Sequence, residues 1–203
     1  MTDEPSFGQR VLRALVWRAR RVGIHISIFV IVRESVSFAN PFELAEGFRL
    51  VRLTEADVDE LLALNPDPNR QEIAGLFDSG KLCFGLRYGP TLVAKMWCDL
   101  AEFSAPVARR PLTSQEAYLF SAYTARSFRG RNLAPTLRSA CYAELRAMGR
   151  THLLSYTEYF NSAARRFKTK LGAVEEDLIY VHVELLNKWS KTWPVRRRAR
   201  RVQ

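Results

Sequence analysis

Cysteine and histidine are scarce in this sequence of 203 residues, which contains three of each. The cysteines, Cys83, Cys98 and Cys141, lie in apolar segments and show no CxxC pair or zinc-ligand spacing. An odd number of scattered cysteines is typical of buried, reduced thiols in a cytoplasmic protein. The sequence therefore predicts neither a disulfide scaffold nor a metal site.

Long hydrophobic runs are also lacking. The apolar stretch at residues 23–32 is much shorter than the roughly 20 residues that a helix needs to cross a bilayer. Arginines precede it, as in the n-region of a signal peptide, but Arg33 and Glu34 follow in place of a small-residue cleavage site. Because β-branched residues dominate the stretch, we interpret it as a strand and expect a cytoplasmic protein without a secretory signal.

Charge of one sign dominates both ends of the chain. The whole chain has a net charge of +10, to which residues 1–21 contribute +3 and residues 188–203 contribute +7. The residues between them, 22–187, therefore carry no net charge. A neutral domain with cationic ends suits contact with a polyanion such as lipid headgroups, nucleic acid or an acidic partner. A solvated tail that only aids solubility has the same composition.

Residues 7–21 are predicted to form an amphipathic helix, because Phe7, Val11 and Leu15 recur at spacings of about four among arginines. Such a helix can lie in a membrane interface or dock its apolar stripe onto the domain, and the sequence favours neither. Together with residues 194–203 it is the candidate contact with an anionic membrane. Nucleic acid is the least favoured partner, since no groove-reading motif accompanies the basic tail.

The middle of the chain alternates strand and helix patterns. We divide the chain into an extension (1–47), a domain (48–187) and a basic tail (188–203). Thr54 is a predicted helix N-cap, and Gly89-Pro90 a hairpin turn. The predicted strands are 24–32, 48–53, 82–88, 92–100, 117–124, 153–156 and 178–186, and the stretch 102–114 is read as polar and irregular. This order predicts an α/β (α+β) fold with a mixed, largely antiparallel sheet flanked by helices.

The most informative segment for chemistry is residues 123–137. A predicted strand runs into a short loop that contains Gly130 and Asn132, and a helix begins at once. The free backbone N–H groups of such a loop and of the first helical turn converge and, with the helix dipole, form an anion site. Arg129 and Arg131 add positive charge suited to a phosphate. From this segment alone, a solvated arginine turn before an ordinary helix is equally well supported.

The loop sequence Arg-Gly-Arg-Asn-Leu-Ala at residues 129–134 resembles the acyl-CoA loop of the GNAT superfamily, R/Q-x-x-G-x-G/A. Arg129 matches its first position and Ala134 its last, while Asn132 stands where glycine is usual. Asparagine is the residue after glycine that best tolerates a positive φ angle.

A second block, residues 161–173, resembles the pattern N-x-x-A-x-x-L-Y-E-K-L-G-F of the same superfamily. Asn161 and Ala164 match, as do Lys170 and the two residues after it. Lys168 occupies the position where many members carry a tyrosine that protonates the leaving thiolate. The resemblance extends over about residues 48–186.

The resemblance implies an acyl-CoA-dependent N-acyltransferase in which an amine attacks the thioester directly, without a metal. It places pantetheine along residues 120–124, with a main-chain N–H near Tyr123 polarising the thioester oxygen. The loop amides would hold the pyrophosphate. The implied cofactor-binding residues are Tyr123, Thr124, Arg129, Gly130, Arg131, Asn132, Leu133, Ala134, Asn161, Arg165 and Lys168.

A carboxylate is expected to take the proton from the acceptor ammonium, directly or through one water. Glu158 and Glu116 are the preferred candidates, with Asp99 as a third, and Tyr123 contributes to the catalytic set through its main chain. The thiolate would receive a proton from Lys168, from a nearby tyrosine (Tyr123, Tyr156 or Tyr159) or from water. Arg109 and Arg110 are candidates for the acceptor side.

The acceptor amine, the acyl length and the choice between a CoA and a carrier-protein donor stay open. The alternative function is a non-catalytic acyl-CoA-binding module that acts as a membrane-associated partner. The arginine-rich leading helix and strand also resemble GNAT-like proteins associated with bacterial exopolysaccharide or envelope gene clusters. A homodimer through the apolar last strand, residues 178–186, is compatible with the sequence.

Overall fold

The computed structural model describes residues 16, 18, 19, 21–37, 42–65, 67–186 and 188–196. The amphipathic helix predicted at residues 7–21 therefore lies almost wholly outside the described residues. The last seven residues of the basic tail lie outside them too, so the structure tests neither prediction.

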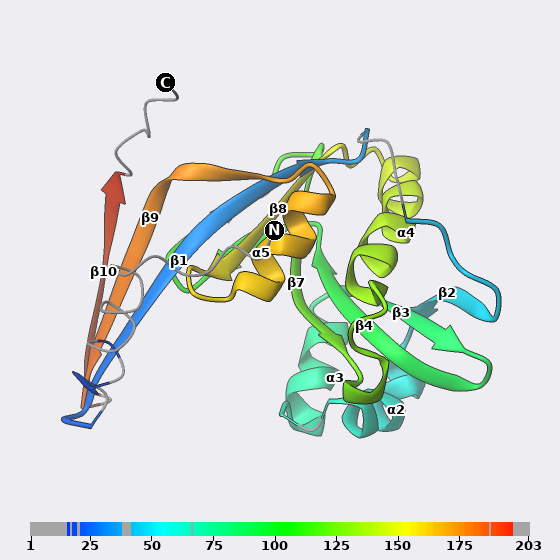
Figure 1. Ribbon diagram of the computed structural model, residues 1–203, viewed down its shortest axis with the longest axis horizontal. Helices are drawn as coiled ribbons and strands as arrows, with labels where there is room; N and C mark the ends of the chain where they lie inside the picture. The colour runs from blue at the N-terminus through cyan, green and yellow to red at the C-terminus, as the bar shows by residue number, and fades with distance from the viewer. Residues whose placement is uncertain are drawn as a thin grey trace.

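Eight strands form one mixed sheet in the order β10-β9-β1-β8-β7-β4-β3-β2 (Figure 1). Every neighbouring pair is antiparallel except β7 and β8. The strands are β1 (Ile24–Ser35), β2 (Phe48–Leu53), β3 (Leu82–Tyr88), β4 (Thr91–Asp99), β7 (Glu116–Thr124), β8 (His152–Glu158), β9 (Val174–Leu185) and β10 (Trp189–Arg196). The predicted fold class, a largely antiparallel sheet flanked by helices, is confirmed.

Helices cover both faces of one part of the sheet. Helices α4 (Leu133–Ala147) and α5 (Ser162–Lys170) lie on one face, and α2 (Val58–Leu64) and α3 (Arg70–Asp78) on the other (Figure 1). Short 3-10 helices, η1 (Glu55–Asp57) and η2 (Arg126–Phe128), lead into α2 and toward α4. The predicted cap at Thr54 forms, since its backbone N–H donates to Asp57 Oδ2 at 2.8 Å.

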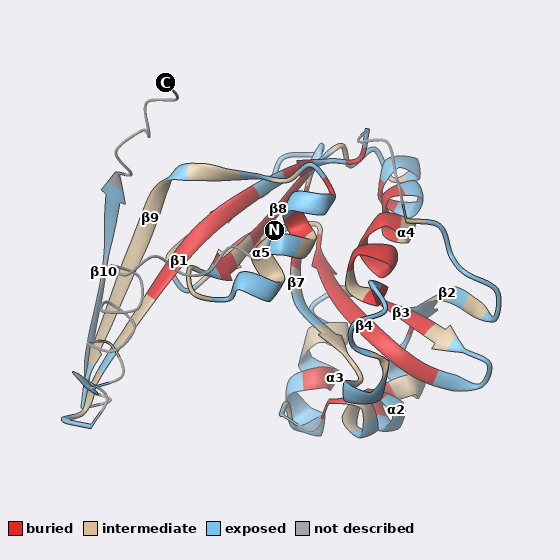
Figure 2. Cartoon of the chain, in the orientation of Figure 1, coloured by how far each residue is buried: buried red, intermediate tan, exposed pale blue. Residues whose placement is uncertain are grey.

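Strand β4 lies in the part of the sheet that is buried on both faces. Its side chains alternate between two cores, and every residue after Thr91 is buried (Figure 2). Met96 belongs to the core under α4, whereas Trp97 belongs to the core under α2 and α3. The three cysteines are buried and free, and burial raises the pKa of Cys83 and of Cys98 to about 12, which makes them unreactive thiols.

Strand β1 lies between β8 and β9, so residues before our boundary at 47 share a sheet with the domain. Its residues 28–32 are buried, and Glu34 enters the core near α4. The Glu34 carboxylate accepts hydrogen bonds from Arg138 Nε at 2.8 Å and from the Tyr142 hydroxyl at 2.6 Å. Burial alone would raise the pKa of Glu34, but Arg138 and Tyr142 outweigh it and hold that pKa below its ordinary value.

Two further strand regions were not predicted. The stretch read as polar and irregular contains a small hairpin, β5 (Glu102–Ala105) with β6 (Ala108–Pro111). The segment assigned to a basic tail begins with β10, which pairs along β9. In β10, the large apolar residues Trp189, Trp193 and Val195 lie at alternate positions, interrupted only by Lys191, but the high positive charge of the surrounding segment concealed this period of two.

Candidate active site between strands β7 and β8

The two central strands β7 and β8 diverge from a common start. They pair only where Glu116–Tyr118 face His152–Leu154, although β7 continues to Thr124 and β8 to Glu158 (Figure 1). Ser121 and Ala122 are consequently exposed, even though β7 lies in the middle of the sheet. The facing edges of the two strands beyond this point are not paired with each other, and we call the region between these edges the slot.

Strand β7 carries a β-bulge at this slot. Trp97 pairs with Phe120 and Lys95 with Tyr123, so two residues of β7 lie opposite one residue of β4. Ser121 adopts a φ of 48°, which is uncommon for a residue other than glycine. Bulges interrupt the hydrogen-bond ladder and redirect the backbone, and they are frequent next to active sites.

A buried lysine on β4 holds the bulge. Lys95 is only 2% exposed, and its Nζ donates to Ser121 Oγ at 2.7 Å. Among the described residues no carboxylate forms an ion pair with it. Burial lowers the pKa of Lys95 to about 8. Our sequence reasoning missed this residue, although a lysine inside the apolar run TLVAKMWC was a visible signal.

The predicted anion loop connects η2 to α4. Gly130 and Asn132 both have positive φ angles, 82° and 57°, so asparagine fulfils the backbone requirement that glycine usually meets. Lys170 Nζ donates to Asn132 Oδ1 at 2.9 Å and ties the loop to α5. Within the part of the chain that the structure describes, no acceptor lies on the backbone N–H groups of residues 130–134. These groups point out of the first turn of α4, where the helix dipole favours an anion.

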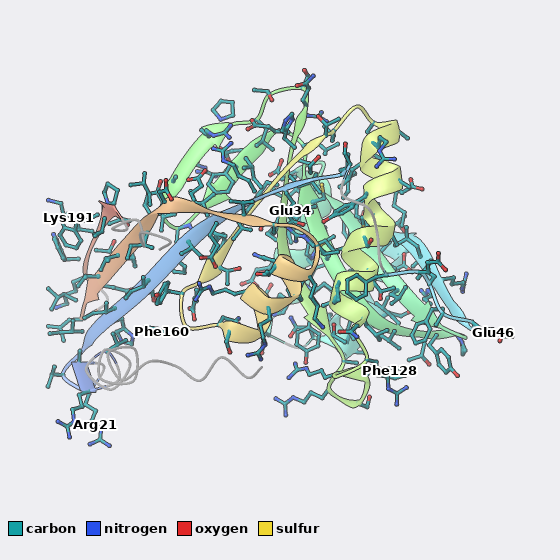
Figure 3. The ribbon with its side chains drawn as sticks, turned by 45° about the horizontal axis from the view of Figure 1, so that its top comes forward. Arg21, Glu34, Glu46, Phe128, Phe160 and Lys191 are labelled. Carbon is teal, nitrogen blue, oxygen red and sulfur yellow. The ribbon has the colours of Figure 1, made fainter. Side chains whose placement is uncertain are left out.

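Arginines surround this loop and rest on aromatic rings. Arg129 Nε donates to the Thr124 carbonyl at 3.1 Å, and its guanidinium lies 5.4 Å from the centroid of the Tyr123 ring. The Arg131 guanidinium lies 5.1 Å from the Phe128 ring, which Figure 3 labels below the start of α4. The loop therefore combines unpaired N–H donors with two exposed cations, as a phosphate site requires.

Helix α5 contributes a second buried lysine. Asn161 caps the helix, because its side chain accepts a hydrogen bond from Ala164 N at 3.0 Å. Lys168 Nζ donates to the Tyr156 carbonyl at 3.0 Å and to the Thr157 hydroxyl, both on β8. Burial and then the positive charge of Arg138 lower the pKa of Lys168 to about 7.

Arg165, the remaining predicted cofactor contact on α5, is already engaged by protein groups. Its Nη2 donates to Glu175 Oε2 at 3.0 Å, and its Nε contacts the same carboxylate. Its Nη1 donates to the Tyr159 carbonyl at 3.1 Å. This pairing compensates its charge. The geometry therefore supports an anion-binding role less for Arg165 than for Arg129 or Arg131.

The three candidate bases have very different surroundings. Glu116 accepts two hydrogen bonds from Arg110, at 2.7 and 2.8 Å, and lies at the closed end of β7; the Arg110 hydrogen bonds hold its pKa at about 2. Asp99 accepts from the backbone N–H groups of residues 101 and 102 and forms an ion pair with Lys81 at 3.3 Å. Both contact patterns are structural and argue against proton transfer.

Glu158 differs from both, because it lies at the open end of β8 and is exposed. Among the described residues its carboxylate has no hydrogen-bond or ion-pair partner. Such a carboxylate is free to accept a proton from a substrate, directly or through water.

Two cavities open on the α2/α3 face of the sheet. The larger, of about 670 Å³, lies between α2 and the end of β7 and is lined by Glu60, Leu64, Tyr123 and residues 125–128. The smaller, of about 240 Å³, is lined by Arg109, Arg110, Arg33 and Tyr180. Aromatic rings connect these regions across β4, β7 and β8, namely Trp97, Phe120, Tyr118 and Tyr156. The structure thus places Arg109 and Arg110 beside a cavity.

The family model described as the Acetyltransferase (GNAT) family matches residues 50–173. This match covers more than half of the 203 residues, and the chain belongs to the GNAT acetyltransferase family. Membership supports acyl-CoA-dependent N-acetyltransferase activity in general. No curated protein sequence matches the chain.

Solved structures share the fold at low identity. An acetyltransferase of the GNAT family from Novosphingobium aromaticivorans is 22% identical with a TM-score of 0.56, and the alignment covers 78% of this chain and 65% of that one. One from Colwellia psychrerythraea is 17% identical with a TM-score of 0.58, covering 88% and 62%. The chain therefore spans less than two thirds of either relative.

An aminoglycoside antibiotic 6'-N-acetyltransferase from Acinetobacter baumannii is 18% identical with a TM-score of 0.50, covering 62% of this chain and 90% of that one.

Among the described residues no group of histidine, cysteine or acidic side chains is arranged to hold a metal ion. Each described helix is too short or too polar to cross a bilayer.

Proposed function

We propose that the protein is an N-acyltransferase that binds an acyl-CoA donor in the slot between β7 and β8. The carrying observation is the exposed bulge of a central strand, Ser121 and Ala122, which leads directly into the loop with unpaired N–H groups at residues 130–134. A thioester arm extended along β7 would meet unpaired backbone. Its pyrophosphate would meet those N–H groups, with Arg129 and Arg131 beside them.

The acceptor is a primary amine that approaches from the α2/α3 face, where the larger cavity reaches Tyr123. Glu158 takes the proton that the ammonium must lose before it can attack. A backbone N–H of the bulged segment near Tyr123 donates to the thioester oxygen as negative charge develops on it. The new bond joins the amine nitrogen to the acyl carbon, the carbon–sulfur bond breaks, and the nitrogen gives up its second proton to solvent as the neutral amide forms.

Lys168 supplies the proton to the departing thiolate in this proposal. It occupies the sequence position of the tyrosine that many family members use, and it lies against β8 with a pKa of about 7. A group with that pKa is protonated in about half of the molecules at neutral pH, so it can give up a proton readily. The donor acyl group is acetyl or longer.

A non-catalytic acyl-CoA-binding module is the second candidate. The lysine in place of the usual tyrosine favours it, because Lys168 already donates to Tyr156 O and the Thr157 hydroxyl. Both candidates need donor binding at the same loop, whereas only the enzyme consumes the donor when an amine is added.

The test combines binding and turnover. Acetyl-CoA and longer acyl-CoAs should raise the melting temperature, because a ligand that binds only the folded state stabilises it, by about 2.7 kcal/mol at a hundredfold excess over Kd. Arg129→Glu and Asn132→Asp should abolish the rise, while Arg49→Glu, which makes the same charge change as Arg129→Glu at an exposed position of β2, should retain it.

Release of CoA thiol with a panel of primary amines then separates the two candidates. Donor binding with thiol release supports the transferase. Binding without release from any amine supports the binding module, and no melting shift with any acyl-CoA would overturn both.

A further inference from the structure

Exposed hydrophobic side chains gather in one region, which we call the arm: strands β1, β9 and β10 with the turn residues 21–23, 186 and 188. Nine large hydrophobic residues are exposed among the described residues, and seven of them belong to the arm. One of these, Val174, lies at the start of β9, away from the tip, and the other six are Val22, Leu185, Leu186, Trp189, Trp193 and Val195. Isolated exposed hydrophobic residues are normal, whereas a cluster of them marks an interaction surface. Figure 2 shows β10 exposed along its length.

The most exposed of these side chains form the tip of the arm. Val22 is 68% exposed and Leu186 is 63% exposed, and they lie in the turns where β1 begins and β9 ends. Leu186 N donates to the Gly23 carbonyl at 2.8 Å, which joins the two turns. Gly23 has a φ of 76°, and a Cβ there would collide with the Leu186 side chain. The absence of a side chain at Gly23 therefore leaves room for the Leu186 side chain.

The outer edge continues the tip as an apolar sheet face. Trp189 pairs with Leu185 and Trp193 with Val181, and directly paired residues share a face. The two indoles are 47% and 38% exposed, and their centroids lie 6.2 Å apart. Lys191 lies between them on the same face, with its Nζ 5.6 Å from the Trp193 ring.

Positive charge borders this apolar surface. Arg21 lies at the tip and Lys191 on the outer strand, as Figure 3 shows, and Lys188 is exposed in the turn before β10. The residues beyond both ends of the arm extend the charge, since residues 1–21 and 188–203 together carry the whole net charge of the chain. Tryptophan prefers the interface between hydrocarbon and water, where neighbouring lysine and arginine reach anionic headgroups.

We propose that the tip and outer edge of the arm bind an anionic lipid surface. Leu185, Leu186 and Val22 enter the interfacial layer with Trp189 and Trp193, while Arg21, Lys188 and Lys191 contact the headgroups. This attachment is peripheral and independent of the slot between β7 and β8. It assigns a partner to the part of the chain that lies outside the family match at residues 50–173.

A second copy of the chain fits this surface less well than a membrane does. Pro194 lies in the edge strand β10, and proline has no N–H group to offer to an incoming strand. Packing two copies face to face would also bring lysines and arginines of the same sign together. Anionic headgroups are instead complementary to these cations.

Vesicle flotation with the full chain tests the proposal. The wild type should float with phosphatidylglycerol–phosphatidylcholine vesicles and much less with phosphatidylcholine alone. Trp189→Thr with Trp193→Thr should weaken binding about tenfold, because two indole rings are no longer transferred from water into the lipid interface. The control pair Leu44→Ser with Val174→Thr, which removes exposed apolar residues outside the apolar face and tip of the arm, should bind like the wild type.

Charge reversal gives a second, matched comparison. Lys188→Glu with Lys191→Glu should weaken binding to the anionic vesicles about tenfold. Arg49→Glu with Arg52→Glu changes the net charge equally on β2, at the opposite edge of the sheet, and should have a smaller effect. Equal losses from both pairs would show that binding depends only on the net charge of the protein. They would overturn the assignment of the arm as the lipid-binding site.

Tryptophan fluorescence with bromine-labelled lipids reports insertion directly. Measured in a Trp17→Phe background, quenching should occur with Trp189 and Trp193 present and disappear when both are replaced, because the one remaining tryptophan, Trp97, is buried in the core. Absence of vesicle binding, or binding without quenching, would overturn the proposal. So would a stable dimer in light scattering that the double tryptophan variant abolishes, because the arm would then bind a second copy.

Discussion

The two halves of the sheet are built from the same kind of strand but differ in how their faces are covered. In the body, which comprises β2 to β4, β7 and β8, helices cover both faces, and β4 is buried on both sides. In the arm, β10 is exposed, and its tryptophans face solvent. The family match at residues 50–173 covers the strands of the body, apart from the first two residues of β2, and none of the arm. The family match therefore lies in the body, and the arm lies outside that match.

The two halves are joined inside the core by a charged cluster. Glu34 comes from β1 of the arm, and Arg138 and Tyr142 come from α4 of the body. Arg138 also places NH1 3.5 Å from Met96 Sδ, so it contacts β4 as well. A buried ion pair of this kind adds little net stability compared with apolar packing, but it makes each partner depend on the other.

The largest expected effect therefore comes from breaking this junction. Glu34→Gln should destabilise the protein by about 3–5 kcal/mol, because it leaves the Arg138 guanidinium buried without a counter-charge. Urea unfolding measures the loss. Glu102→Gln removes the partner of Arg109 in an exposed ion pair and should cost less than about 1 kcal/mol. Similar losses from both would mean that the arm and the body are not coupled through Glu34.

The next largest effect concerns Glu158, the carboxylate of the body that we propose as the base. Glu158→Gln should lower kcat/KM about a hundredfold or more at neutral pH, since an amide cannot accept the ammonium proton. Glu116→Gln is the matched control at the closed end of the same strand pair, and it should leave kcat within a few fold. Thiol release with a responsive amine measures both. A larger loss from Glu116→Gln than from Glu158→Gln would reverse our assignment.

These two sites also show what the sequence could predict. The strands and helices of the body were predictable because each has its own local signal, such as the cap at Thr54 or the turn at Gly89. The loop at residues 129–134 was recognisable because the residues that permit its positive φ angles, Gly130 and Asn132, lie next to each other but one in the sequence. The slot was not, because it depends on where β7 and β8 stop pairing, and no local pattern records that.

The arm was harder to predict for the same physical reason. The apolar run of residues 24–32 indicated a strand, but its place between β8 and β9 depends on partners more than a hundred residues away. The buried charges Glu34 and Lys95 are interpretable only once their neighbours are known. Long-range pairing, unlike helix capping or turn formation, leaves no signature at a fixed spacing.

A third prediction uses pH to compare the buried lysines of the body. The pKa of Lys168 is lowered to about 7 and that of Lys95 to about 8, while both return toward 10.5 on unfolding. The unfolded chain therefore binds more protons between those values, so both lysines make stability rise with pH. Their cost is fully present below the folded pKa and is relieved as pH increases toward 10.5.

Replacing either lysine by methionine should remove its share of this pH dependence. The advantage of Lys168→Met over the wild type should begin to shrink above pH 7, and that of Lys95→Met only above pH 8. Unfolding free energies measured from pH 6 to pH 10 check both curves. A pH-independent difference for either variant would show that the lysine is not buried as a charge.

The smallest effect, about tenfold in affinity, tests how Lys95 serves the slot. We expect Lys95→Met to weaken acetyl-CoA binding, because Ser121 Oγ loses the donor that holds the bulge at a φ of 48°. The same variant should be more stable than the wild type near neutral pH, since a buried charge is gone. A residue with a purely structural role would not combine higher stability with weaker binding.

Ser121→Ala completes a double-mutant cycle with Lys95→Met. If Lys95 acts through Ser121, each single variant should weaken acetyl-CoA binding by a similar factor, and the double variant should be no weaker than either one. Calorimetric titration of the four proteins gives the coupling. Additive losses would mean that Lys95 contacts the donor independently of the bulge. Lys95 would then be a residue that contacts the donor, and not one that supports the backbone of the bulge.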